Sequence, residues 1–179
     1  MKRKAILFLT ALLLGVSGCM APPAGLEKAR FQLTSFAEIK DDDFHCQCKT
    51  IRLAGRVMKV TVQPQQTKVE ILSLPVSPLA AKPMLDATPN GRFIAYFHGL
   101  IEPEMLKEQF ITLGGILTKR ESGKIDQADY VYPVVNVQQY RLWKLGQSYY
   151  YPFDDDLWGV PWGWRHRWYD EVRVQYYLY

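Results

Sequence analysis

The chain has 179 residues, of which 22 are Lys or Arg and 18 are Asp or Glu, and its sequence pI is near 8.9. Lys2, Arg3 and Lys4 lie in an N-terminal segment that we expect to be removed, which leaves 19 basic residues against 18 acidic ones. The mature chain is then nearly neutral, so its pI is no argument for a nucleic-acid partner and we expect none. Without residues 1–18, about 160 residues remain, which suit one domain with extensions.

Residues 1–18 have the parts of a secretory signal peptide. A basic head precedes an apolar run from Ala5 to Val16, and small residues follow it. As a helix, the run would be about 18 Å long, at roughly 1.5 Å per residue. A hydrocarbon core of about 30 Å is too thick for it. We therefore predict a cleaved signal rather than a transmembrane helix.

Val16-Ser17-Gly18-Cys19 resembles the bacterial lipobox. In that motif the peptide is cut before the cysteine, here between Gly18 and Cys19. The cysteine sulfur carries a diacylglyceryl group, and its new α-amino group is acylated, with palmitate as the expected acyl chain. Each buried CH₂ contributes about 0.8 kcal/mol, so several chains anchor a protein stably. Met20 stands where inner-membrane lipoproteins of this type have Asp, which predicts a periplasm-facing anchor in the outer membrane.

Residues 19–44 are expected to form an N-terminal tether. Pro22 and Pro23 favour extended backbone, residues 26–39 could form a short amphipathic helix, and Asp41–Asp43 are expected in a solvated turn rather than a metal site. For Cys46 and Cys48, a local disulfide, an intermolecular disulfide and free thiols all remain open. A zinc site is disfavoured because His98 and His166 are far away in sequence.

Residues 45–144 are predicted to form the folded domain. A phase switch beside Gly55 predicts a bulge there, and Gly114-Gly115 permit a bend. Five strands are predicted, over residues 51–62, 67–75, 92–100, 110–117 and 130–144. Turn-forming residues and a short helix over residues 102–109 separate them, and the fifth strand is expected to be the last. This order predicts an all-β chain with one short helix, folded as an OB-like five-stranded barrel. A β-sandwich or a mixed α+β sheet is the alternative.

Leu113, Val135 and Val137 are predicted to be buried in central strands. Five short motifs in one order span the predicted domain: Gly91-Arg92-Phe93, Gly99-Leu100-Ile101-Glu102-Pro103, Ile111-Thr112-Leu113-Gly114, Tyr132-Pro133-Val134 and Leu142-Trp143. Together with the lipobox they resemble the Slp family of enterobacterial outer-membrane lipoproteins, over residues 50–144. The resemblance implies a lipoprotein associated with starvation or stress, and it implies no catalytic residues. Cys46 and Cys48 have no counterpart in the family's motifs.

Catalytic motifs are missing from the sequence: it has no G-x-S-x-G, no H-E-x-x-H and no Walker loop, and its three histidines are scattered. We therefore predict a non-catalytic protein without a cofactor or metal, held at the membrane through Cys19, with an envelope protein as its candidate partner. His98, in an apolar strand, is expected in the core or at its rim. The alternative is a module for a small ligand or envelope component, with an aromatic platform of Phe93, Tyr96, Phe97 and Trp143, although core packing is the favoured role of these rings.

Residues 145–179 are an aromatic-rich extension without a helical stripe. A disordered tail and an arm on the barrel are the plain interpretations. A third interpretation is contact with the membrane surface, where Trp and Tyr rings settle because they are apolar with one polar atom. The residues that would make membrane or ligand contact are Trp158, Trp162, Trp164 and Trp168.

Overall fold

The computed structural model describes residues 21–150 and 173–179. Gly18 and Cys19 of the lipobox and the four tryptophans at 158, 162, 164 and 168 lie outside the described residues. These residues form five long strands, one short α-helix and a pair of shorter strands: β1 Thr50–Val62, β2 Gln66–Leu74, β3 Gly91–His98, α2 Pro103–Leu106, β4 Phe110–Ile125, β5 Ala128–Trp143, β6 Leu145–Tyr150 and β7 Arg173–Leu178.

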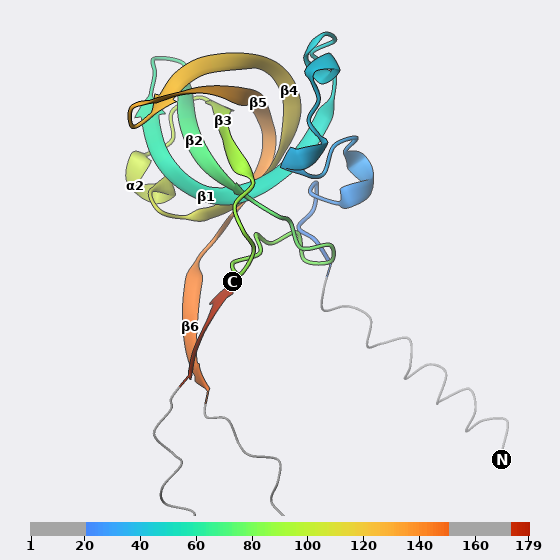
Figure 1. Ribbon diagram of the computed structural model, residues 1–179. Coiled ribbons are helices and arrows are strands. Elements are labelled where there is room, and N and C mark those ends of the chain that lie inside the picture. The colour runs from blue at the N-terminus through green and yellow to red at the C-terminus, as the bar shows by residue number, and fades with distance from the viewer. Residues whose placement is uncertain (1–20, 151–172) are drawn as a thin grey trace, which may run out of the picture.

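The first five strands close into a barrel in the order β1-β2-β3-β5-β4 (Figure 1). All neighbours are antiparallel except β3 and β5, which run parallel over Ile94–Tyr96 and Val134–Asn136. This order, with α2 between β3 and β4, is that of an OB-fold. Within the part of the chain that the structure describes, the predicted all-β class with one short helix and the five-stranded OB-like barrel are confirmed.

Three irregularities in strand pairing let long strands coil around the barrel. The pairing of β1 with β2 shifts between Val57 and Lys59, whereas the bulge was predicted beside Gly55, two residues earlier. The pairing of β4 with β5 shifts between Gly114 and Gly115, where a bend was expected, and again between Leu117 and Lys119. A Cβ on Gly115 would lie 2.1 Å from the backbone oxygen of Asn136, so only glycine allows this approach of the two strands.

The barrel interior is filled by apolar side chains that alternate along the strands. Leu113 and Val135 are fully buried, as predicted, whereas Val137 only packs against the core from a half-buried position. The prediction that Val137 is buried was therefore wrong. The buried cluster consists of Ile51, Leu53, Val57, Val69, Ile71, Phe93, Ala95, Phe97, Leu106, Ile111, Leu113, Leu117 and Val135.

The N-terminal stretch packs on the outside of the barrel, which differs from an extended tether. Three 3-10 helices, Lys28–Arg30, Phe36–Glu38 and Asp41–Phe44, stand where an amphipathic helix and an aspartate turn were expected. Leu26 is buried, and its carbonyl accepts a hydrogen bond of 2.7 Å from the guanidinium of the buried Arg52. The burial lowers the pKa of Arg52. The apolar residues of this stretch lie only roughly on one face of a helix. The stretch therefore does not form a regular amphipathic helix, and individual residues such as Leu26 attach it to the barrel.

Two further strands lie beyond β5, so the prediction that the fifth strand is the last was wrong. β6 and β7 form an antiparallel ribbon that projects from one side of the barrel (Figure 1). At its base, the backbones of Lys144 and Tyr179 exchange two hydrogen bonds of 3.0 and 3.1 Å. Lys82 donates from Nζ to the carbonyl of Leu178 at 2.7 Å, and the Leu178 side chain is buried. The ribbon is thus fixed to the barrel at both of its strands.

Truncation of the core tests the strand register. We expect Leu113→Ala to lower the free energy of unfolding by about 3 kcal/mol, because it leaves a cavity in the barrel. Val137→Ala should cost about 1 kcal/mol, because Val137 is half-buried and its surroundings can close around the gap. Urea denaturation followed by circular dichroism measures both values. Equal and small losses at the two positions would contradict the register.

Candidate functional site

The outer face of β2 and β3 carries the most developed polar site of the described chain. In OB-folds this face, flanked by the β1–β2 and β4–β5 connections, is where ligands bind. Here the long β4–β5 hairpin lies against it and leaves a groove of about 260 Å³. We call it the hairpin groove; the charged and aromatic residues that line it are Lys59, Lys68, Glu70, Glu121, Lys124 and Tyr132.

Strand alternation explains how these side chains meet. On β2, Thr67, Val69 and Ile71 point into the barrel, so Lys68 and Glu70 point outward. On β4, beyond the barrel, Glu121 forms an ion pair with Lys68 and accepts a hydrogen bond of 2.8 Å from the Tyr96 hydroxyl. One carboxylate therefore joins three strands.

A second carboxylate, that of Glu70 on β2, joins β2 to β3 and β5. Glu70 accepts a hydrogen bond of 2.7 Å from Arg92 on β3 and one of 3.3 Å from the Tyr132 hydroxyl on β5. Beneath them, Ile94, Tyr132 and Val134 form a small apolar cluster of their own, outside the barrel interior. The β4–β5 hairpin is thus held onto β2 and β3 by polar and apolar contacts together.

The pKa values follow from these contacts. Burial alone would raise the pKa of Glu121, but the hydrogen bonds from Lys68 and Tyr96 outweigh it, so the pKa of this carboxyl lies below its ordinary value. Burial and the hydrogen bond to Glu121 raise the pKa of Tyr96 to about 12. Burial, followed by the charge of Glu70, also raises the pKa of Tyr132. At neutral pH the Glu121 carboxylate is therefore ionised, and the phenols of Tyr96 and Tyr132 are protonated.

The predicted aromatic platform is not formed as one surface. Phe93 and Phe97 belong to the barrel core, and Trp143 is buried with its indole N–H donating to Thr112 at 3.0 Å. Of the four rings, Tyr96 alone lies on the groove face through its contact with Glu121. The favoured alternative, core packing, describes the other three.

Sequence reasoning missed two tyrosines of this face. Tyr130 and Tyr132 pack edge to face with ring centroids 4.7 Å apart, and the Tyr130 hydroxyl accepts a hydrogen bond of 3.0 Å from the backbone of Arg92. Their spacing in "YVY" places both on one side of a strand, which was a usable signal. His98, expected in the core or at its rim, is exposed beside the β1–β2 turn.

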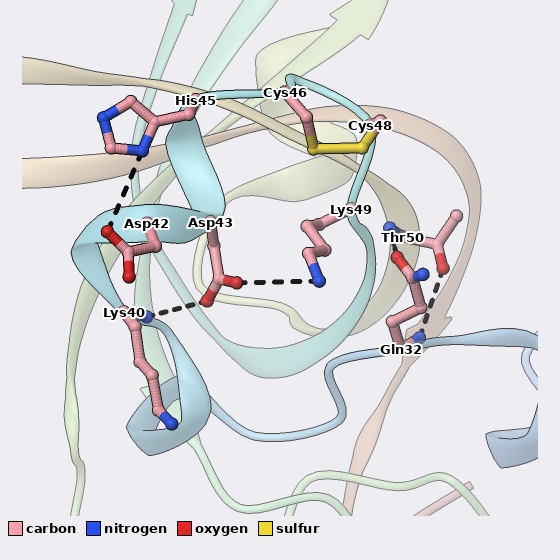
Figure 2. A network of polar contacts seen from close by, with 9 residues as sticks. All are labelled: Gln32, Lys40, Asp42, Asp43, His45, Cys46, Cys48, Lys49 and Thr50. Carbon is pink, nitrogen blue, oxygen red and sulfur yellow. Dashed lines mark hydrogen bonds and ion pairs between the residues drawn. A yellow bond between two sulfur atoms is a disulfide. The ribbon is translucent and has the colours of Figure 1, made fainter.

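Cys46 and Cys48 form a disulfide with their Cα atoms 5.1 Å apart, which answers the question that the sequence left open. Figure 2 shows this turn beside the 3-10 helix Asp41–Phe44. Asp43, predicted in a solvated turn, is buried; its carboxylate accepts a hydrogen bond of 2.8 Å from the Lys40 backbone and lies 4.0 Å from the Lys49 ammonium. Within residues 21–150 and 173–179, no three His, Cys, Asp or Glu side chains are grouped as metal ligands would be.

The low pKa of Glu121 makes a pH-dependent prediction. A carboxyl whose folded-state pKa is depressed stabilises the fold above its unfolded-state pKa, and this contribution is lost as the pH falls through the folded-state pKa. Glu121→Gln should therefore cost about 1 kcal/mol at pH 7 and progressively less as the pH approaches 3. Urea unfolding at several pH values measures the difference. Glu104→Gln, at an exposed helix position, is the control, and a pH-independent cost at Glu121 would contradict the assignment.

Comparisons with known proteins agree with this picture. A model of the outer membrane lipoprotein Slp family matches residues 16–169. An uncharacterised protein of Haemophilus influenzae is 53% identical over 99% of this chain and 100% of its own length. The outer membrane protein Slp of Escherichia coli is 28% identical over 62% of this chain and 64% of its own.

Among solved structures, the mitochondrial single-stranded DNA-binding protein Rim1 of S. cerevisiae is similar over 52% of this chain and 92% of that chain. Its identity of 13% and TM-score of 0.32 are too low to support a comparison of function. In the described parts of this chain, no helix has the length and apolar character of a membrane span. The match over most of the sequence decides the family: this chain belongs to the outer membrane lipoprotein Slp family.

Proposed function

We propose that this protein is a non-catalytic lipoprotein, attached through Cys19 to the periplasmic leaflet of the outer membrane, whose β6–β7 ribbon rests on the lipid surface. The barrel then serves as a rigid platform that can present its outer faces to an envelope partner. The observation that carries this proposal is the exposed apolar face of the ribbon. The family match supports attachment to the outer membrane. The family resemblance also implies an association with starvation or stress. A comparison of protein levels in growing and starved cells tests that association.

The ribbon is amphipathic. Residues 145, 147 and 149 alternate with 146 and 148, so one face of the ribbon collects most of its apolar side chains. This face remains open to solvent along most of its length: Leu145 is 50% exposed, Tyr149 61%, Val174 43% and Tyr176 56%. Apolar surface of this kind marks an interaction site, and a two-stranded ribbon is marginally stable without one.

The surroundings of the ribbon fit a lipid surface. In Figure 1 the blue segment that begins at residue 21 starts on the side of the barrel from which the ribbon projects. At the base of the ribbon, the exposed cations Arg56, Lys107 and Lys144 line a second groove, with Glu108 as the opposing charge. Cations beside an apolar face favour anionic headgroups.

A non-catalytic role is supported by how the ionisable groups are used. The apolar core fills the barrel interior, so ligand binding inside the barrel would require its displacement. In the hairpin groove, Lys68 is paired with Glu121, which holds the hairpin in place, and beside the groove Arg92 is paired with Glu70. The two described histidines are both exposed: His45 has its Nδ1 3.9 Å from Oδ1 of Asp42, and His98 lies beside the β1–β2 turn, away from the hairpin groove lining.

The hairpin groove keeps a second candidate function, the binding of a small polar ligand or envelope component. The position of the groove in the OB-fold favours this candidate. It ranks second because a charged ligand would have to compete with the Lys68–Glu121 ion pair for the same groups. A photo-cross-linker placed at Lys59, on the groove, and at Lys28, away from it, would separate a groove partner from general contact.

The anchor is tested by lipid labelling. We expect the mature N-terminal peptide to begin at Cys19 with added acyl mass, and radiolabelled palmitate to be incorporated. Cys19→Ser should abolish the label and release the protein from outer-membrane fractions, since one ribbon is a far weaker anchor than two or three acyl chains. Mass spectrometry and membrane fractionation measure these outcomes. A labelled or membrane-bound Cys19→Ser protein, or residence in the inner membrane, would refute the anchor.

The ribbon is tested in the soluble Cys19→Ser form without its signal. We expect weak binding to vesicles that contain phosphatidylglycerol, less to neutral vesicles, and a blue shift of tryptophan emission from Trp158, Trp162, Trp164 and Trp168. Replacing Tyr149 and Tyr176 by Ser, or the four tryptophans by Ser, should reduce binding at least tenfold, because apolar area is lost. The control is Leu100→Ser with Met105→Ser, exposed apolar side chains outside the ribbon. Binding that survives both ribbon variants would leave the ribbon without a membrane role.

A further inference from the structure

The Cys46–Cys48 disulfide closes a very short loop. It joins residues that are separated by Gln47 alone. A disulfide stabilises a fold mainly by restricting the unfolded chain, and its effect grows with the length of the loop that it closes. Here the loop is so short that the bond can restrict little. Both cysteines are also exposed, and exposed disulfides are the ones that exchange readily.

We propose that Cys46 and Cys48 form a thiol–disulfide exchange site that reacts with accessible thiols of other proteins in the same compartment. This inference is independent of the membrane contact, because the turn belongs to the barrel domain and not to the ribbon.

The backbone of the turn favours opening. Gln47 has a φ of +48°, in the left-handed region that residues other than glycine rarely adopt. The disulfide confines this residue, since it ties the side chains on either side of it together. Reduction allows Gln47 to leave the left-handed region, so the reduced form gains conformational freedom that the oxidised form lacks.

The ends of the turn are held independently of the disulfide, as a reversible site requires. On one side, the 3-10 helix Asp41–Phe44 is fixed through Asp43, whose carboxylate reaches Lys49 across the turn (Figure 2). On the other side, the Leu117 backbone donates to the carbonyl of Lys49 at 2.9 Å. These contacts should keep the two thiols near each other after reduction, so that the disulfide can form again.

Local charge does not oppose an incoming thiolate strongly. Of the three acidic residues in the neighbouring 3-10 helix, Asp41 forms an ion pair with Arg120, and Asp43 lies beside Lys49. Lys49 directly follows Cys48 in the sequence. A nearby cation stabilises a thiolate, including the one that leaves when the disulfide opens.

The exchange step is balanced as follows. A thiolate of the partner attacks one sulfur of the Cys46–Cys48 bond, which breaks and gives a mixed disulfide and a free thiolate on the other cysteine. That thiolate takes up a proton. A second thiolate of the partner then attacks the mixed disulfide, so the partner gains a disulfide and this chain gains two thiols. Two electrons pass from the partner's thiols to this chain, and the reverse sequence reduces a partner's disulfide.

The first test measures exchange with glutathione as the probe. The soluble Cys19→Ser form leaves Cys46 and Cys48 as its two cysteines. After incubation in mixtures of reduced and oxidised glutathione, thiols are alkylated and the products weighed by mass spectrometry. We expect oxidised and reduced forms to interconvert while the protein stays folded, and Cys48→Ser to accumulate a mixed disulfide on Cys46. A disulfide that stays closed in excess reduced glutathione would overturn the proposal.

Two variants separate exchange from a structural role. The double variant with Ser at both positions should keep the urea midpoint of the oxidised protein within error, because the loop restricts little. Marked destabilisation would show a structural cross-link and contradict the proposal. Gln47→Gly should shift the glutathione equilibrium toward the disulfide by about fivefold, because glycine tolerates the left-handed region. If Gln47→Gly and the unchanged protein have the same equilibrium with glutathione, the left-handed backbone of Gln47 has no role in opening the disulfide.

Discussion

The double pairing of β4 is the constraint on which the rest of the structure depends. Its first half pairs with β1 over Phe110–Ile116, and its whole length pairs with β5. The bend at Gly114-Gly115 lets one strand serve both neighbours, because the backbone of β5 comes within the space that a side chain would need. Through this bend β4 joins β1 to β5, which closes the barrel. The hairpin groove exists because β4 continues beyond the barrel.

Burial on the inner face made the barrel predictable. The alternation of apolar residues predicted β1 to β3 closely, and Pro103 with its acidic neighbours predicted α2. The second half of β4 was missed because Lys119–Lys124 carry no apolar alternation. That half is held by pairing with β5 and by Glu121, and both are contacts over long sequence distances. For the same reason, no local pattern indicates that Lys68, Tyr96 and Glu121 meet.

The two ends of the chain behave differently from each other and from expectation. Leu26 and Arg52 bring the N-terminal stretch onto the barrel through a buried guanidinium, which local sequence patterns do not reveal. The C-terminal stretch is rich in aromatic residues, and it was not predicted to form paired strands, because its alternation of apolar and polar residues is short. Pairing of β6 with β7 requires the chain to return across residues 151–172, and no local pattern encodes a return over that distance.

The antiparallel pairing of Tyr150 with Arg173 brings the two ends of residues 151–172 together at the far end of the ribbon. The entropy of closing a loop grows only with the logarithm of its length, and each doubling costs about 0.6 kcal/mol. Insertions or exchanges between β6 and β7 should therefore affect the stability of the barrel little. A change there leaves the barrel sequence and its core untouched, which makes this part of the chain the natural place for a reporter or a change of lipid preference.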